Sequence, residues 1–190
     1  LGFVEPAWPD VLLQGGETIS AGPFDFEVIW TPGHSPGHIC LYEKKRKILL
    51  SGDHVLPVIT PNVSYHAESG PNPLSDYVRS LHRIESLPAE LVLPAHEQIF
   101  TGLKERIKAI LDHHEARKRA IMDTILQEPR TAYDISGRIP WETMGVPWEK
   151  LSAFVKRSAV TETLAHLFYM EEQCMMKTEQ ANGVVKLLPM

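Results

Sequence analysis

Short apolar runs separated by turn residues dominate the first half of the chain. Residues 24–30 alternate between apolar and polar, residues 38–42 and 47–51 form two further apolar runs around the charged segment 43–46, and residues 91–93 form a fourth. Alternation with a period of two, or a short apolar run bounded by turn residues, is typical of strands. We therefore predict a sheet in which polar residues follow the strand ends.

The segment between the third and fourth predicted strands contains a loop and a helix. Residues 56–73 are rich in Pro, Asn, Ser and Gly, which predicts a long loop of the kind that lines substrate clefts. A helix is expected next, with Ser75 as its N-cap and Tyr77, Leu81 and Ile84 on one face. Strands alternating with helices indicate the α/β class, here a layered (α+β) domain.

The pattern becomes helical after residue 103. Residues 103–126 have helical composition and spacing, and Thr131 to Asp134 resembles a capping box that opens a short helix ended by Gly137. Residues 147–172 predict another helix, with a kink, whose buried residues include Trp148, Leu151, Val155, Leu164, Leu167 and Phe168. Asn182-Gly183 is a strong hairpin signal.

Three helices followed by a hairpin form a winged-helix pattern. We therefore expect one domain over residues 1–112 and a small winged-helix domain over residues 113–190. Residues 113–190 contain 10 Lys and Arg against 10 Asp and Glu, so they lack the basic stripe of a duplex-DNA reader. Packing against the first domain, or lining one wall of its cleft, is the better expectation.

Composition narrows the class of protein. The 190 residues carry a formal net charge of −5 and are 43% hydrophobic, as in globular proteins without general affinity for nucleic acid or anionic membranes. No apolar stretch reaches the about 18 residues of a transmembrane helix. Cys40 and Cys174 are far apart in sequence, which favours reduced thiols and a cytoplasmic location.

Three short motifs carry metal-binding chemistry. His34 lies in Thr-Pro-Gly-His-Ser-Pro-Gly-His, Asp53 in Ser-Gly-Asp-His and His96 in Pro-Ala-His-Glu, each after a short apolar run. Prolines and glycines stiffen the turn around His34, and imidazole and carboxylate are common ligands of divalent metals. We predict that these three side chains share a metal site in which the Asp53 carboxylate bridges two cations.

The other histidines receive weaker predictions. His38 could form a hydrogen bond behind the ligands, or be structural. His54 follows Asp53 directly and is expected to point the other way. His66 could bind substrate, although a solvated loop residue is the simpler interpretation. The remaining ones lie on predicted helices and are interpreted as structural: His82, His113, His114 and His166.

Together the three motifs, at spacings of 19 and 43 residues, resemble the second half of the metallo-β-lactamase superfamily signature. The resemblance implies the C-terminal half of an αββα fold. It implies that His34 is the third imidazole on a first metal, Asp53 the bridging and catalytic carboxylate, and His96 a ligand of a second metal. It also implies two divalent ions, zinc by default, with iron or manganese as alternatives.

The resemblance also implies ligands upstream. The superfamily carries a His-x-His-x-Asp-His segment before the motif of His34, whereas here no histidine precedes His34 and residue 1 is Leu. We therefore expect the native polypeptide to have an upstream segment, and residues 1–190 alone to hold one ion or none and to be catalytically incomplete.

Three functions remain open. By resemblance to glyoxalase II-like members, the first is hydrolysis of a small ester or thioester by a metal-bound hydroxide. By resemblance to lactamase-like nucleases with a winged helix, the second is cleavage of single-stranded RNA, which would weaken steeply with salt. The third is a non-catalytic fragment that binds a partner or forms an oligomer through exposed apolar surface.

Overall fold

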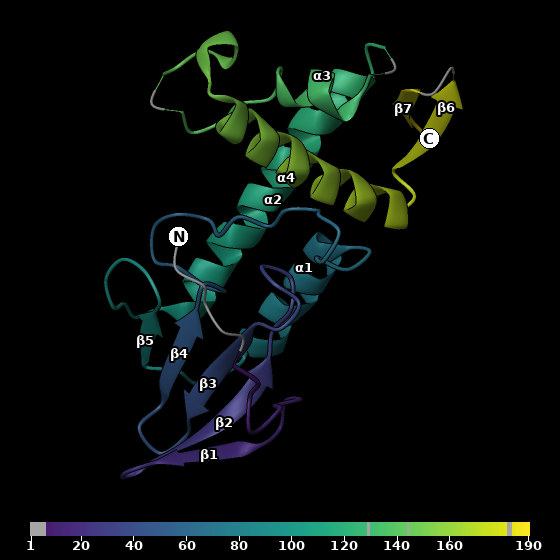
Figure 1. Cartoon of the computed structure of the whole chain (residues 1–190). Helices are drawn as coiled ribbons and strands as arrows, with labels where there is room; N and C mark the ends of the chain where they lie inside the picture. Colours follow the sequence, from purple (N-terminus) through teal and green to yellow (C-terminus); the bar gives the residue numbers. More distant parts are fainter. Residues whose placement is uncertain (1–6, 129, 144, 182–183) are drawn as a thin grey trace.

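The fold is described from a computed structural model covering residues 7–128, 130–143, 145–181 and 184–190. Figure 1 shows a sheet with helices packed on one side and a smaller helical region beyond them. The elements in chain order are β1 (Thr18–Ala21), β2 (Phe24–Trp30), β3 (Ile39–Glu43), β4 (Ile48–Gly52), α1 (Pro73–Ile84), β5 (Leu91–Pro94), α2 (Leu103–Ile125), α3 (Ala132–Ser136), the 3-10 helix η1 (Trp148–Lys150), α4 (Ala153–Glu172), β6 (Met176–Ala181) and β7 (Val184–Pro189).

The main sheet has five strands in the order β1-β2-β3-β4-β5. The first four pair antiparallel, and β5 pairs parallel to β4, with Leu49 opposite Val92. Side chains alternate between the two faces of a sheet; Cys40, Leu49 and Val92 therefore share the face that packs against α1 and α2, where all three are buried. The mixed α/β class and the four predicted strands are confirmed, with shifts of one residue at strand ends.

The N-cap of α1 differs from the prediction. Asn72, rather than Ser75, caps the helix: the Asn72 side chain accepts a hydrogen bond from the backbone N–H of Ser75, and Pro73 occupies the first turn. A proline at that position has its φ angle already set for a helix and lacks only an N–H that the helix does not use. Tyr77, Leu81 and Ile84 form the buried face, as predicted.

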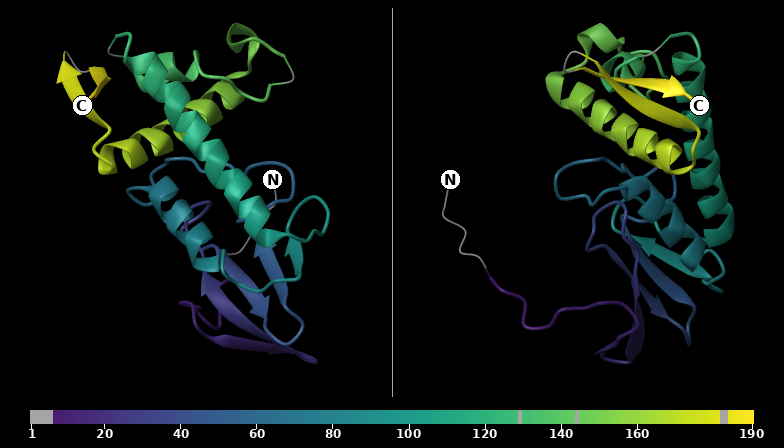
Figure 2. Two further views of the ribbon diagram at one scale, coloured as in Figure 1. Left: turned by 180° about the vertical axis from the view of Figure 1, so that it is seen from behind. Right: turned by 90° about the vertical axis from the view of Figure 1, so that its right-hand side faces the viewer.

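The helix α2 belongs to two hydrophobic cores. Its first half contributes Leu103, Ile107 and Ile110 to the core beneath the sheet, and its second half contributes Ile121 and Ile125 to a separate core with α3, α4, β6 and β7. Figure 2 shows α2 running from the sheet to the smaller helical region. The boundary predicted at residues 112 and 113 falls inside this continuous helix, and the division into two domains stays a prediction.

The second region of the molecule is formed around the second core by the end of α2 with α3, α4, β6 and β7. Within it, α3 begins with a capping box. At Thr131 the side chain accepts from the backbone N–H of Asp134 while the Asp134 carboxylate accepts from the backbone N–H of Thr131, which confirms the capping box. The predicted helix over 147–172 is interrupted: η1 ends at Lys150, and α4 starts at Ala153 with Ser152 as N-cap. The Ser152 hydroxyl accepts from the N–H of Val155, which starts a new helix instead of continuing the first.

The burial predicted for α4 is only partly correct. Leu167 is buried, whereas Val155, in the first turn of α4, is 39% exposed. The strands β6 and β7 pair antiparallel, and their predicted turn, Asn182-Gly183, lies outside the described residues. The order of helices and hairpin follows the prediction, and the winged-helix class stays a prediction. No helix in the described ranges has the length and apolar character needed to cross a membrane.

Candidate functional site

The structure brings His34, Asp53 and His96 together at one edge of the sheet. The His96 Nε2 atom lies 3.3 Å from Asp53 Oδ1, and the His34 Nε2 atom lies 3.8 Å from Asp53 Oδ2. Since β4 and β5 are parallel neighbours, the residues that follow them emerge at the same edge, and the N–H of Ala95 donates to the carbonyl of Gly52 at 3.0 Å. Both Asp53 oxygens therefore face an imidazole.

The turn that carries His34 is packed tightly against α1. Gly33 has φ +133°, and a Cβ at this position would lie 2.4 Å from the Tyr77 Cα atom, so a side chain there would collide with the helix. The hydroxyl of Ser80 donates to the carbonyl of Pro32 at 2.9 Å. The turn is thus fixed by close backbone contact, and glycine is needed to make that contact.

His38 lies directly behind Asp53. Its Nε2 atom accepts from the backbone N–H of Asp53 at 3.1 Å, and its Nδ1 atom lies 2.8 Å from the hydroxyl of Thr31. Gly52, with φ +54°, leaves room for this ring, because a Cβ there would lie 2.5 Å from His38 Nε2. Burial, with a smaller effect of His34, lowers the pKa of His38 to about 4, so the imidazole is neutral and can accept.

The other nitrogen of His34 is held by a loop. His34 Nδ1 lies 2.8 Å from the backbone carbonyl of Asn62; a carbonyl only accepts, so Nδ1 carries a proton. In the neutral ring, Nε2 is then an unprotonated acceptor that faces the Asp53 carboxylate. Two acceptors facing each other without a shared proton repel, and a cation between them would remove that repulsion.

Helix α4 fixes this loop. The Asn62 side-chain amide donates to the Glu162 carboxylate at 3.0 Å, and the backbone N–H of Tyr65 donates to the carbonyl of Thr161 at 2.9 Å. The second region of the molecule is therefore connected to His34 through one loop residue. Sequence reasoning missed Asn62 and Glu162, which are 100 positions apart; the one local signal is a carboxylate in a largely apolar stretch of helix.

The earlier part of the same loop is held by Arg106 and Glu97. The Arg106 guanidinium donates to the carbonyls of Leu56, Val58 and Ile59 at 2.5, 2.9 and 2.7 Å. The Glu97 carboxylate accepts from the N–H of Val58 at 3.1 Å. These contacts join the start of the loop predicted over residues 56–73 to the first part of α2 and to the residue that follows His96.

The remaining histidines separate into buried and exposed ones. His54 is fully buried, with its ring centroid 4.8 Å from that of Tyr77, and burial lowers the pKa of its imidazole to about 3. His114 and His166 are buried against each other, with 3.1 Å between His114 Nδ1 and His166 Nε2. His66 is exposed and lines a shallow hollow beside α4; within the described ranges no polar contact joins it to the three residues that converge.

Comparison with known proteins agrees with this geometry. Residues 2–96 match the family model described as the metallo-beta-lactamase superfamily. The chain belongs to this superfamily. A solved beta-lactamase domain protein from Burkholderia ambifaria superposes with a TM-score of 0.86 at 31% identity, covering 97% of this chain and 54% of that one. The fold of this chain is therefore that of the superfamily.

Two curated relatives of the superfamily are named as thioesterases. The acyl-coenzyme A thioesterase MBLAC2 of Gallus gallus is 40% identical over 101 residues, which is 51% of this chain and 35% of that protein. The atrochrysone carboxyl ACP thioesterase of Aspergillus fumigatus is 26% identical over 125 residues, 64% of this chain and 37% of that protein. The matched regions thus span little more than a third of these relatives.

The donors at Asp53 fit a divalent metal in kind. Asp53 Oδ1 is buried and has no hydrogen-bond partner among the described residues, although a buried carboxylate oxygen normally has one. Two imidazoles and one carboxylate are ligands that zinc or iron accepts. As arranged, no group of three or more His, Cys, Asp or Glu among the described residues would hold an ion by itself.

Proposed function

We propose that this chain carries one half of a metal centre that hydrolyses thioesters. His34, Asp53 and His96 would be ligands, with Asp53 shared between two ions, and zinc is the ion we expect, with iron or manganese as alternatives. The observation that carries the proposal is the convergence of two imidazoles on the two oxygens of Asp53, one of which is buried and accepts no hydrogen bond from the described residues.

The superfamily and the two thioesterase relatives support the substrate class. A metal at this position, when bound, supplies a nucleophilic hydroxide at neutral pH and polarises the carbonyl of the substrate. The protein would supply orientation. His38 holds the backbone of Asp53, and the Asn62 carbonyl keeps the proton of His34 on Nδ1, so that Nε2 points toward Asp53.

The other predicted functions have less support. The second region is balanced in charge, with 10 basic and 10 acidic residues over 113–190, which does not favour binding of RNA.

We also propose a cytoplasmic location. Both cysteines are free, with Cys40 buried, which fits that location.

Thiol release from an acyl-coenzyme A tests the function. The zinc-loaded protein, with its native upstream sequence where that exists, should release thiol, whereas the Asp53→Asn variant should not. A phosphodiester and single-stranded RNA serve as comparison substrates. Cleavage of RNA that falls steeply with salt, together with no thioester hydrolysis, would replace our proposal with the nuclease.

A further inference from the structure

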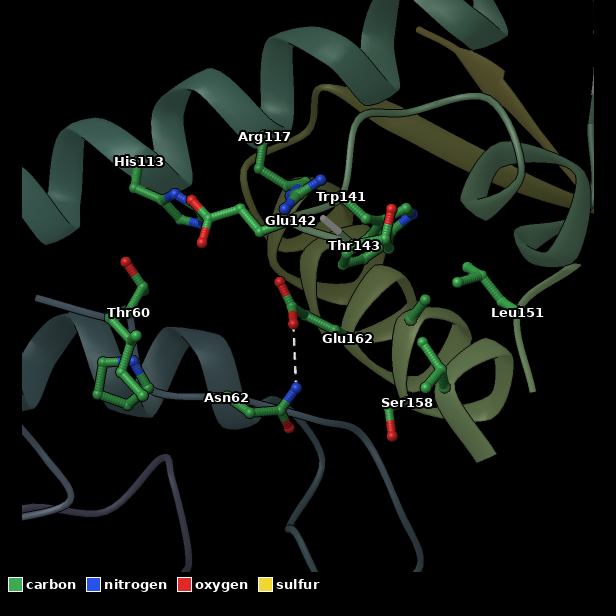
Figure 3. A pocket seen from close by; sticks show the side chains of 14 residues that line it. Thr60, Asn62, His113, Arg117, Trp141, Glu142, Thr143, Leu151, Ser158 and Glu162 are labelled. Carbon is green, nitrogen blue, oxygen red and sulfur yellow. Dashed lines mark hydrogen bonds between the residues drawn. The ribbon is translucent and has the colours of Figure 1, made fainter. Parts of the chain in front are cut away.

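A cavity of about 220 Å³ lies between residues 59–62 of the loop and the helices α2 and α4. Figure 3 shows that polar side chains from segments far apart in sequence line this cavity, Thr60 and Asn62 of the loop among them. His113 and Arg117 come from α2, Glu142 from the segment after α3, and Glu162 from α4. Apolar walls are formed by residues that include Trp141, Leu151 and Val155.

Arg117, which lines this cavity, has unused hydrogen-bonding capacity. The residue is only 9% exposed, and its guanidinium carbon lies 4.1 Å from the centroid of the Trp141 ring. One terminal nitrogen donates to the carbonyl of Pro140, while the buried Nε atom has no partner among the described residues. A buried donor without an acceptor costs free energy, so a ligand that offers an acceptor would be stabilised here.

The carboxylates determine which acceptor fits. Glu142 and Glu162 line the same cavity as Arg117, so the wall carries one cationic and two anionic groups. An anionic ligand would meet net repulsion. A neutral amide can donate its N–H to a carboxylate and accept from the guanidinium through its carbonyl, and the apolar wall can cover the adjoining carbon atoms.

We propose that this cavity binds an amide-bearing segment of the leaving group of a thioester, the pantetheine arm that coenzyme A and acyl carrier proteins share. The proposal rests on the proposed thioesterase function. Asn62 lines the cavity, and its backbone carbonyl accepts a hydrogen bond from His34. Asn62 would therefore be the one residue between an arm bound in the cavity and the candidate ligand His34.

Binding of S-methyl pantetheine, a thioether that cannot be hydrolysed, tests the proposal without catalysis. Titration calorimetry should show binding to the wild-type protein and a Kd raised by about tenfold or more in Arg117→Met, because a hydrogen bond to a charged group is lost. The matched control is Arg119→Met on the exposed side of the same helix, which should bind as the wild type does. Thermal unfolding of each variant verifies that it is folded.

A second variant tests the proposal even if Arg117→Met does not fold. Glu162→Gln keeps a carbonyl oxygen that can accept from Asn62 but removes the negative charge, and it should also weaken binding. Failure of the wild type to bind S-methyl pantetheine would overturn the proposal, as would equal binding by Arg117→Met and Arg119→Met, or equal binding of an amide-free thioether of similar length.

The two sources of the arm are separated by comparing S-methyl coenzyme A with an acyl carrier protein that carries the same S-methyl arm. Tighter binding of either one, weakened by Arg117→Met, supports the cavity and identifies the source. Binding of coenzyme A that is unaffected by Arg117→Met would overturn it. If the wild type binds the arm but hydrolyses no thioester, the proposed function fails while the binding site stands.

Discussion

At the sheet edge, the side chains of His34 and His96 are 33% and 68% exposed and face a carboxylate, whereas His114 and His166, between α2 and α4, are buried and contact each other. At the sheet edge, the Nε2 atoms of both imidazoles face the Asp53 carboxylate. Between α2 and α4, His166 Nδ1 lies 2.9 Å from the carbonyl of Glu162 and Nε2 lies next to His114. The imidazoles of His34 and His96 are therefore available for chemistry, whereas those of His114 and His166 are used in packing.

The largest effect is expected when the Asp53 carboxylate at the sheet edge is removed. Asp53→Ala should lower thioester hydrolysis by more than about a hundredfold and reduce bound zinc, because even groups behind metal ligands change affinity or activity by ten- to a hundredfold. Elemental analysis and a thiol-release assay measure both. Asp123→Ala, at an exposed position of α2, is the control. Unchanged zinc content in Asp53→Ala would refute the role of Asp53.

The second prediction concerns the free energy of unfolding at acid pH, to which the buried pair of His114 and His166 contributes. Burial lowers the pKa of His166 to about 3 and that of His114 well below its usual value. The unfolded chain therefore binds more protons than the folded one below about pH 6.5, and stability falls as pH drops through this range, by up to about 1.4 kcal/mol per pH unit for each histidine.

Urea unfolding between pH 7 and 4 measures this loss. In His166→Gln the slope against pH should be smaller than in the wild type, whatever the absolute stability of the variant. His82→Gln, which changes an exposed histidine, should keep the wild-type slope. Equal slopes in all three proteins would show that the buried pair does not control acid stability.

The third prediction links the two regions through Asn62. Asn62→Ala keeps the backbone carbonyl that bonds His34 but removes the amide that donates to Glu162. Zinc affinity should fall by about tenfold, the lower end of the effect seen for residues that orient ligands. Competition with a chromogenic chelator measures the affinity. Ser64→Ala removes a hydroxyl that contacts the Asn62 side chain and the Thr161 hydroxyl but leaves the Asn62–Glu162 contact in place, and it should have a smaller effect.

The smallest effect is expected at Asn72, which also joins the two regions. Its side chain caps α1 and donates to the Glu172 carboxylate at 2.6 Å. Asn72→Ala should lower the free energy of unfolding by about 1 kcal/mol, as for other N-caps, without changing zinc affinity. Chemical denaturation measures the first quantity, and a loss of zinc affinity equal to that of Asn62→Ala would contradict the distinction between the two links.

The sequence predicted what depends on local pattern. The strands followed from short apolar runs, the Thr131 cap from a four-residue motif, and the three residues that converge from turns after strands. The predicted cap of α1 is wrong, because Pro73 in the first turn marks the residue before it, Asn72, as the cap. Glu162 and Arg117 could not be found locally, since their roles depend on how α2 and α4 pack against a distant loop.

Helix α2 contributes to two hydrophobic cores, and this limits the insertions and deletions that it can accept. The 23 residues of α2 are anchored in the first core up to Ile110 and in the second from Ile121 onward. Because each residue advances an α-helix by about 100°, a single residue inserted between these anchors would rotate one set out of phase with the other. The length of this stretch is therefore as constrained as its composition, and only changes near whole turns would keep both sets of anchors facing their partners.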